Sequence, residues 1–173
     1  SITSFGAANH VFKDRTGGIW ISSELNIHVL NRSLPRLPEI QDLLPLGRSA
    51  AEDRDGTIWF FGGPIADYRV YSFDPITGIS TRHTPHIPRT RTFVWFYVSV
   101  RSKFVWLVGT EEIVRFEPRN PEAYEIIQPP VPFYPSGIFI ESRGLLWLGT
   151  AGYGVEMYNP AVERFGTIPK SLF

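Results

Sequence analysis

Short apolar runs separated by glycine and proline make up almost the whole chain. Fifteen Gly and fifteen Pro are spread through 173 residues, and the runs between them are rich in Val, Ile, Phe, Trp and Tyr, as β-strands are. Proline and glycine interrupt nearly every window in which apolar residues recur at helical spacing. The best helical candidate, "LPEIQDLLPL" (37–46), allows only a turn or two. The pattern therefore predicts an all-β fold.

Tryptophans mark an internal repeat. They recur 39, 47 and 41 residues apart, in "KDRTGGIWISS", "EDRDGTIWFFG", "VRSKFVWLVGT" and "ESRGLLWLGT". Three copies carry an acid six residues before the tryptophan and a glycine three residues before it. The repeat anchors, to which we assign structural roles, are Trp20, Trp59, Trp106, Trp147, Asp14, Asp53, Glu141, Gly17, Gly56 and Gly144. The third copy has Val100 and Lys103 at the acid and glycine positions, which predicts an altered turn there.

An alternating run closed by Asn, Asp or Glu follows each tryptophan, as in "VYSFDPITG" and "VEMYNPAVERF". Asn/Asp–Pro starts turns because the side chain bonds nearby backbone amides while proline fixes its own φ. Each unit of ~40 residues then yields four short strands, the mark of a β-propeller blade. We predict blades at about 8–48, 49–90, 91–134 and 135–173, with each tryptophan buried between neighbouring sheets. Four such blades form either a small closed ring or part of a larger propeller.

The stretch "EDRDGTIWFFG" (52–62) has two interpretations. Asp53, Asp55 and Gly56 look like the start of a cation loop, but a calcium loop needs further oxygen ligands at fixed offsets, and "TIWFFGG" supplies none. A turn in which the Asp side chain bonds backbone amides and Gly takes a positive φ explains the same residues. We favour the turn, and we predict no metal site and no cofactor.

The repeats resemble the two-component regulator propeller repeat. "AAEDRDGTIWFFG" with "VYSFDP", and "FIESRGLLWLGTAGYGVEMYNP", are similar to its succession of an acid, a glycine turn, a tryptophan strand and an aromatic–Asp/Asn–Pro strand. The resemblance covers about 10–170. It implies an extracytoplasmic sensor domain, on the periplasmic or extracellular side of a bacterial membrane, that responds to sugars or glycans. Sensors of this family carry many more repeats than four, and this chain holds no kinase, receiver or DNA-binding segment, so a fragment or a short relative is expected.

Candidate ligand residues lie in two groups of loops. "TRHTPHIPRTRT" (81–92) gathers guanidinium and imidazole groups without an acid, and guanidinium groups can fork onto carboxylate, sulfate or phosphate. The loops after the tryptophan strands place aromatic faces beside hydrogen-bonding groups, which suits sugars. The simpler alternatives are a solvated linker balanced by the acids of 111–125, and turns shaped by Gly and aromatics. The candidates, for a glycan or an acidic oligosaccharide, are Tyr68, Arg69, Arg82, His83, His86, Arg89, Arg91, Glu111 and Tyr153.

Charge and composition exclude other classes of protein. The formal net charge is +0, so no global field attracts nucleic acid or an anionic membrane. No apolar run approaches the ~20 residues that a membrane helix needs, and the absence of cysteine excludes disulfides and thiolate metal sites. The chain begins at Ser1, which predicts a processed, trimmed or partial polypeptide.

The sequence favours a binding protein over an enzyme. It contains no Gly-x-Ser-x-Gly elbow, no cysteine nucleophile and no phosphate loop. One alternative is a structural subunit that docks on other protein chains in a larger extracytoplasmic or membrane-associated complex. The least favoured alternative is a propeller lyase similar to the streptogramin-inactivating enzymes, which would use His and Glu near the axis. Its candidates, His10 and His28, have no evident Glu companion in the sequence.

Overall fold

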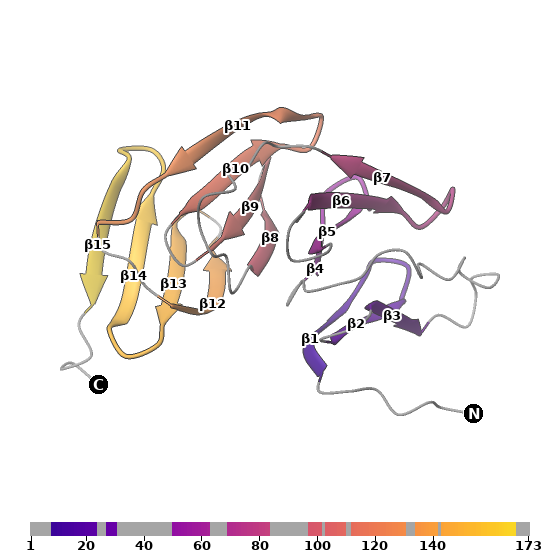
Figure 1. Cartoon of the computed structure of the whole chain (residues 1–173), viewed down its shortest axis with the longest axis horizontal. Helices are drawn as coiled ribbons and strands as arrows, with labels where there is room; N and C mark the ends of the chain where they lie inside the picture. Colours follow the sequence, from indigo (N-terminus) through magenta and orange to yellow (C-terminus); the bar gives the residue numbers. More distant parts are fainter. Residues whose placement is uncertain are drawn as a thin grey trace. The chain divides into compact units, whose positions relative to one another are not determined.

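The structure is a computed structural model that describes residues 8–23, 27–30, 50–62, 69–83, 97–101, 103–109, 112–130, 134–141 and 143–168. These ranges contain fifteen β-strands and no helix (Figure 1). The strands are β1 (Ala8–Lys13), β2 (Ile19–Ser23), β3 (Ile27–Leu30), β4 (Ala50–Glu52), β5 (Ile58–Gly62), β6 (Arg69–Asp74), β7 (Ile79–His83), β8 (Tyr97–Arg101), β9 (Phe104–Val108), β10 (Ile113–Glu117), β11 (Asn120–Ile127), β12 (Pro135–Ile140), β13 (Leu146–Thr150), β14 (Gly154–Asn159) and β15 (Arg164–Ile168).

The strands form four antiparallel sheets in which spatial neighbours follow chain order (Figure 1). We call them blade 1 (β1–β3), blade 2 (β4–β7), blade 3 (β8–β11) and blade 4 (β12–β15). Blades 1 and 2 belong to one compact unit, Ser1–Arg89, and blades 3 and 4 belong to a second, Thr90–Phe173. The predicted all-β class is confirmed. The segment 37–46 and the fourth strand expected in blade 1 lie outside the described residues, and the predicted blade limits stay a prediction.

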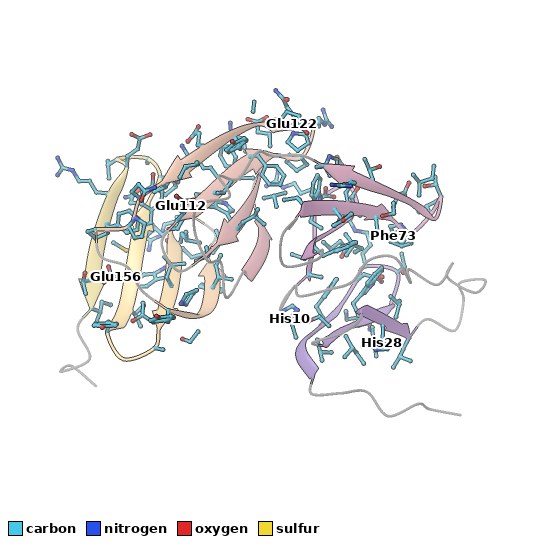
Figure 2. All side chains as sticks on the ribbon, in the orientation of Figure 1. His10, His28, Phe73, Glu112, Glu122 and Glu156 are labelled. Carbon is cyan, nitrogen blue, oxygen red and sulfur yellow. The ribbon has the colours of Figure 1, made fainter. Side chains whose placement is uncertain are left out.

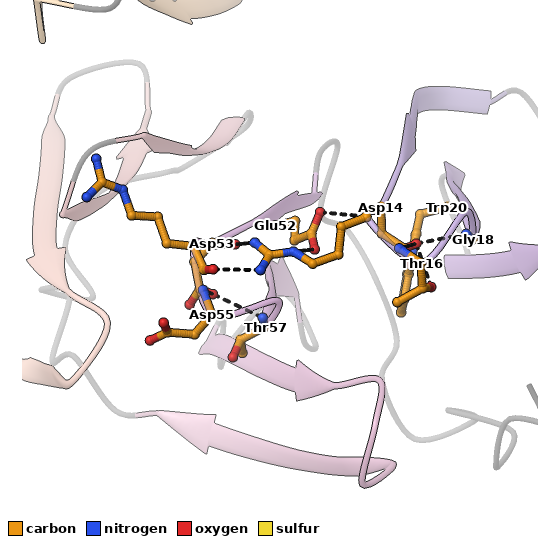
Figure 3. Close-up of polar contacts among 10 residues, drawn as sticks. Asp14, Thr16, Gly18, Trp20, Glu52, Asp53, Asp55 and Thr57 are labelled. Carbon is orange, nitrogen blue, oxygen red and sulfur yellow. Dashed lines mark hydrogen bonds and ion pairs between the residues drawn. The ribbon is translucent and has the colours of Figure 1, made fainter.

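An aspartate fastens the turn between the first two strands of blade 1 to the tryptophan of the second strand (Figure 3). The buried Asp14 Oδ1 accepts hydrogen bonds from the backbone N–H groups of Thr16 and Gly18, at 2.9 and 2.7 Å. Its Oδ2 accepts a hydrogen bond of 2.7 Å from Trp20 Nε1. Burial disfavours the charged carboxylate, but the bonds from Trp20, Thr16 and Gly18 outweigh it and hold the pKa of Asp14 below its ordinary value.

Blade 2 repeats this arrangement at the stretch 52–62. Asp53 Oδ1 accepts hydrogen bonds from the backbone N–H groups of Asp55 and Thr57, at 2.9 and 3.0 Å, and Oδ2 accepts one of 2.7 Å from Trp59 Nε1. Gly56 has a φ of 92°, in the left-handed region that favours glycine. Both oxygens of the Asp53 carboxylate serve the turn, so the turn interpretation is confirmed.

In blade 4 a glutamate replaces the aspartate, and among the described residues the turn keeps its backbone hydrogen bonds. Glu141 N donates to Leu145 O at 3.0 Å, and Gly144 N donates to Glu141 O at 2.9 Å. The Glu141 carboxylate accepts hydrogen bonds of 2.8 and 3.2 Å from Arg143. One extra methylene therefore carries this carboxylate out to an exposed arginine, and blade 4 keeps the turn through its backbone bonds.

The corresponding turn of blade 3 is shorter. Arg101 pairs with Phe104, which leaves a two-residue loop between β8 and β9. The altered turn predicted from Val100 and Lys103 is therefore confirmed. Since no acid stands six residues before Trp106, its buried Nε1 has no hydrogen-bond partner within the described ranges.

The Asn/Asp–Pro turns between third and fourth strands also follow the sequence prediction. Asp74 Oδ1 and Asn159 Oδ1 each accept a hydrogen bond from the backbone N–H two residues later, at 2.8 and 3.0 Å. The last loop residue in each turn takes a left-handed φ: 73° at Gly78 and 52° at Glu163. A non-glycine residue is strained in this region, so Glu163 occupies a position that blade 2 fills without strain.

The core of the first unit lies between blades 1 and 2. The buried Trp20 points its edge at Phe73, with ring centroids 5.7 Å apart, and Phe12 stacks on Trp20 at 6.0 Å. Ile58 and Phe60, which flank the tryptophan of blade 2, complete the cluster. Removing so large a side chain from a packed core costs about 3–5 kcal/mol.

The core of the second unit uses the same positions between blades 3 and 4. Trp106 meets Tyr158 edge-on, with ring centroids 6.3 Å apart, and packs with Leu146 and Leu148. Tyr158 stands before Asn–Pro as Phe73 stands before Asp–Pro. The prediction that tryptophans lie between neighbouring sheets is thus confirmed for the first and third copies.

The other two tryptophans differ from each other. Trp59 is buried. Trp147 is only half-buried, on a face of blade 4 where Phe139 is 57% exposed. The prediction of four equivalent buried tryptophans is therefore wrong for Trp147, because no described sheet covers this face.

Arg15 joins the turn of blade 1 to the turn of blade 2. Its Nε lies 2.6 Å from Glu52 Oε1, and its Nη1 and Nη2 donate to the backbone carbonyls of Arg54 and Asp53, each at 2.6 Å. The guanidinium fork thus bonds three acceptors of the neighbouring blade and fixes the rim of the first core.

Candidate functional site

Most of the candidate ligand residues lie outside the described part of the chain. These are Tyr68, His86, Arg89, Arg91 and Glu111. Arg69 begins β6 and is described by its backbone alone, whereas Arg82, His83 and Tyr153 are described with their side chains. The basic cluster of 81–92 therefore stays a prediction.

His83 is held by its own blade. Its ring stacks on Trp59, with centroids 5.0 Å apart and planes at 26°, and its Nε2 lies 2.7 Å from Ser72 Oγ. The adjacent Arg82 is exposed. A ligand would have to compete with these contacts for the imidazole, so the structure gives His83 a packing role that its place in the basic segment did not indicate.

Two exposed tyrosines lie in neighbouring segments at one end of blade 4, where β12 begins and β13 ends. Tyr153 is 62% exposed in the turn between β13 and β14, and Tyr134, just before β12, is 59% exposed. Ala151 N donates a hydrogen bond of 2.8 Å to Tyr134 O, which fastens the two segments together. Gly152 and Gly154, with φ of 100° and 97°, shape the turn. We call Tyr134 and Tyr153 the tyrosine edge. Tyr134 lies in the loop that leads into the first strand of the blade, and Tyr153 lies in the loop after the tryptophan strand. These loops are neighbours because the two strands are antiparallel.

Sequence reasoning named Tyr153 as a candidate and did not single out Tyr134. The missed residue stands in the proline-rich stretch "QPPVPFYPSG" (128–137), where an aromatic side chain is most simply explained as part of a turn. The signal that identifies it is its place directly before the first strand of a blade, because that end of the strand lies next to the turn after the tryptophan strand.

A groove of about 450 Å³ lies between β11 and the outer strands of blade 4. Tyr158 and Phe165, whose ring centroids are 4.8 Å apart, form its apolar side. Burial raises the pKa of the Tyr158 hydroxyl, so this group stays protonated at neutral pH. The groove is lined by Glu125, Ile126, Ile127, Gln128, Tyr158, Glu163 and Phe165.

The buried Arg115 forms ion pairs with the two acidic residues of this groove, Glu125 and Glu163. Arg115 Nη2 lies 2.6 Å from Glu125 Oε2 and 4.0 Å from Glu163 Oε1. The Arg115 guanidinium also lies over the rings of Phe104 and Trp106, at 5.1 and 5.6 Å from their centroids. Because these carboxylates neutralise Arg115, they are less available to a ligand than the exposed rings of the tyrosine edge.

Two buried glutamates in the second unit were not singled out as site residues from the sequence (Figure 2). The Thr167 hydroxyl lies 2.9 Å from both carboxylate oxygens of Glu156. Gln128 Nε2 donates to Glu112 Oε1 at 3.4 Å. Buried acids are rare in proteins unless paired. The sequence signal for the burial of Glu156 was its position in the strand "GVEMYN". Side chains two residues apart in a strand point to the same face, so Glu156 shares a face with the core residue Tyr158.

The two histidines of the lyase alternative do not converge. Strand register places His10 on the face of blade 1 that carries Phe12 and Trp20, and His28 on the opposite face (Figure 2). Burial lowers the pKa of His10, which keeps the ring neutral at pH 7. No group of three His, Cys, Asp or Glu side chains in the described ranges could hold a metal ion.

Neither a protein-family model nor a curated protein matches this sequence. Solved structures do. An extracellular domain assigned to a one-component system of Bacteroides thetaiotaomicron matches with a TM-score of 0.69 and 16% identity over 96% of this chain. A second extracellular domain, assigned to a hybrid two-component system of the same organism, matches with a TM-score of 0.63 and 20% identity over 95% of this chain.

The chain has a β-propeller fold. It spans about a quarter of those two chains, 24% and 23%. The likeness agrees with the resemblance to the two-component regulator propeller repeat. The fold also matches a gluconolactonase of Xanthomonas campestris, with a TM-score of 0.69 and 18% identity over 94% of this chain and 62% of that chain. Within its described residues, the chain has no helix with the length and apolar character of a membrane span.

Proposed function

We propose that this chain is part of a β-propeller that senses an oligosaccharide for a bacterial signalling system, on the periplasmic or extracellular side of the membrane. Its fold matches two extracellular domains of such systems over 96% and 95% of the chain. The repeats resemble those of the same class of sensors. In this proposal the chain binds its ligand and performs no catalysis.

The tyrosine edge is the observation that carries the ligand class. A phenol ring offers an apolar face to the C–H groups of a sugar and a hydroxyl that both donates and accepts hydrogen bonds. Tyr134 and Tyr153 each expose more than half of their surface, and the hydrogen bond from Ala151 N to Tyr134 O joins the two segments that carry them. Two such rings on one edge suit a chain of sugar units better than a single small molecule.

The basic segment 81–92 is a separate candidate for ligand contact, drawn from the sequence. Arg82, Arg89 and Arg91 would attract a ligand that carries carboxylate or sulfate groups. Charge attraction at an exposed surface is screened by salt. An acidic oligosaccharide should therefore bind less tightly as ionic strength rises, whereas binding of a neutral one should change little.

Titration calorimetry against a panel of neutral and acidic oligosaccharides tests the proposal. Tyr134→Ala and Tyr153→Ala should each weaken binding about tenfold, since a stacked ring contributes roughly 1–1.5 kcal/mol. Tyr153→Phe keeps the ring and should retain most of the affinity. Ile79→Ala, at an exposed apolar residue of β7, is the matched control and should bind as the wild type does.

The results separate the function from the site. No heat with any oligosaccharide would refute the sensing proposal. Binding that survives both tyrosine substitutions and is lost with Gln128→Ala would move the site to the groove between β11 and blade 4 and would leave the function in place.

A further inference from the structure

The groove between the last strands of blades 3 and 4 has no part in the sensing site. Its volume of about 450 Å³ falls within the roughly 300–1,000 Å³ of small-molecule sites. One wall is the end of β11, and the other is formed by β14, β15 and the turn between them. Both walls belong to sheets that pack on each other through the second core. The groove is therefore built entirely between two neighbouring blades.

The two walls of the groove are apolar at their base. Tyr158 belongs to the buried core, and Ile127 and Phe165 are partly buried side chains packed against that core. The rings of Tyr158 and Phe165 lie 4.8 Å apart at an angle of 44°, so one wall is aromatic and the other, at Ile127, is aliphatic. An unbranched alkyl chain suits such walls, as the stem of a lysine side chain suits an apolar surface.

The carboxylates of the groove leave one negative charge in surplus. Arg115 Nε and Nη2 lie 2.7 and 2.6 Å from Glu125 Oε2, whereas Glu163 Oε1 is 4.0 Å from Nη2. One guanidinium balances one carboxylate, and the short contacts assign that balance to Glu125. The Glu163 side chain is 75% exposed. The adjacent Arg164 alternates with Phe165 along β15 and so belongs to the opposite face of the sheet.

The backbone of Glu163 indicates that its side chain serves more than the turn. Its φ is 52°, whereas blade 2 has Gly78 at this position with a φ of 73°. A glycine would make the turn without strain. The contact with Arg115 is too long for a hydrogen bond. Neither the turn nor the arginine therefore accounts for a carboxylate at this strained position.

We propose that this groove binds a small aliphatic amine, with its ammonium group at Glu163 and its alkyl chain between Ile127 and the ring of Phe165. An ammonium group is attracted both to a carboxylate and to the face of an aromatic ring. Gln128, which also lines the groove, carries an amide oxygen that can accept a further N–H. A neutral sugar would gain nothing from the surplus charge, so this site is independent of the tyrosine edge.

Titration calorimetry with pentylamine tests the proposal on the 173-residue chain. At pH 7 this probe carries one ammonium group on a straight alkyl chain. Pentanol and pentanoate are its neutral and anionic counterparts, and methylamine carries the charge without the long chain. Pentylamine should bind saturably and less tightly as ionic strength rises. Pentanol and pentanoate should give no binding, and methylamine should bind at least about fivefold more weakly than pentylamine.

Two variants of the groove and one control locate the site. Glu163→Gln removes the surplus charge and should weaken pentylamine binding about fivefold. Phe165→Leu replaces the aromatic wall by an aliphatic one and should weaken it about threefold. The matched control Glu117→Gln removes one charge from an exposed ion pair of blade 3 that does not line the groove, and it should bind as the wild type does. Circular dichroism verifies that each variant keeps its strands.

Three results would overturn the proposal: no saturable heat with pentylamine, equal binding of pentanol, or equal affinity of Glu163→Gln and Glu117→Gln for pentylamine. None of them bears on the sensing function, which is measured with oligosaccharides and the tyrosine variants.

Discussion

Replacing the buried aspartate of blade 1 by asparagine tests whether the carboxylate–indole bond holds the first core. In Asp14→Asn the remaining oxygen still accepts from the N–H groups of Thr16 and Gly18, which the wild-type Oδ1 accepts at 2.9 and 2.7 Å. The amide nitrogen is then directed at Trp20 Nε1, so a donor faces a donor in place of the bond of 2.7 Å.

The expected loss follows from that single contact. A hydrogen bond to a charged group contributes about 1.5–3 kcal/mol, and a buried donor left without an acceptor costs about 1–3 kcal/mol. We therefore expect Asp14→Asn to lower the free energy of unfolding by about 3 kcal/mol, a large share of the roughly 5–15 kcal/mol of a domain. Urea unfolding followed by circular dichroism measures this value.

The substitution should also change how stability depends on pH. The pKa of Asp14 is lower in the folded chain than its ordinary value. Its contribution is therefore present above the unfolded pKa and is lost as the pH falls through the folded pKa. Wild-type stability should decline in this acidic window, and the variant should lack that part of the decline.

A double-mutant cycle with Trp20→Phe isolates the bond. The coupling energy between the two positions should lie near 2 kcal/mol, within the range for residues in contact. The control Asp55→Asn alters an exposed aspartate of the equivalent turn and should change stability by less than about 0.5 kcal/mol. A coupling energy near zero, or a variant as stable as the control, would show that the bond does not secure the core.

Three further predictions use the same unfolding assay. Trp106→Phe should cost about 1 kcal/mol, clearly less than Trp20→Phe, because its Nε1 has no partner to lose in the described residues; equal costs would contradict this. Glu163→Gly should stabilise by about 0.5–1 kcal/mol, since it places glycine at the left-handed position that Gly78 occupies in blade 2; a loss of stability would refute the strain. Arg15→Lys should cost about 1–2 kcal/mol, because a single ammonium cannot bond three acceptors as the guanidinium fork does. An unchanged midpoint of urea unfolding would show that these three contacts do not stabilise the fold.

Local features of the fold could be predicted because their contacts are close in sequence. Asp14 and Trp20 are six residues apart, and the intervening Gly17 has a φ of 91°. Three copies of that spacing were enough to predict the turn, and its loss in the third copy predicted the altered turn there. The contacts of Arg15 were not predicted, since they join residues 37 or more positions apart.

The site was less predictable for a related reason. His83 belongs to a basic segment by composition, yet its contact with Trp59 depends on the registers of β5, β6 and β7, which composition does not fix. Arg115 and Glu125 are directly opposite across β10 and β11, which follows only once the short loop between these strands is known. The tyrosine edge depends on where two loops meet, and one repeat copy alone does not show that.

The two described junctions, between blades 1 and 2 and between blades 3 and 4, each join a tryptophan of one sheet to apolar residues of the next. This arrangement has a consequence for how such a chain can change its length in evolution. Every sheet carries an indole on one side and an aliphatic row on the other, as blade 3 does with Trp106, Val105 and Leu107. A stretch of DNA that encodes one whole sheet can therefore be duplicated or deleted, and the two new neighbours still match. The number of sheets is then set by how many units the gene encodes, without any redesign of the surfaces between them.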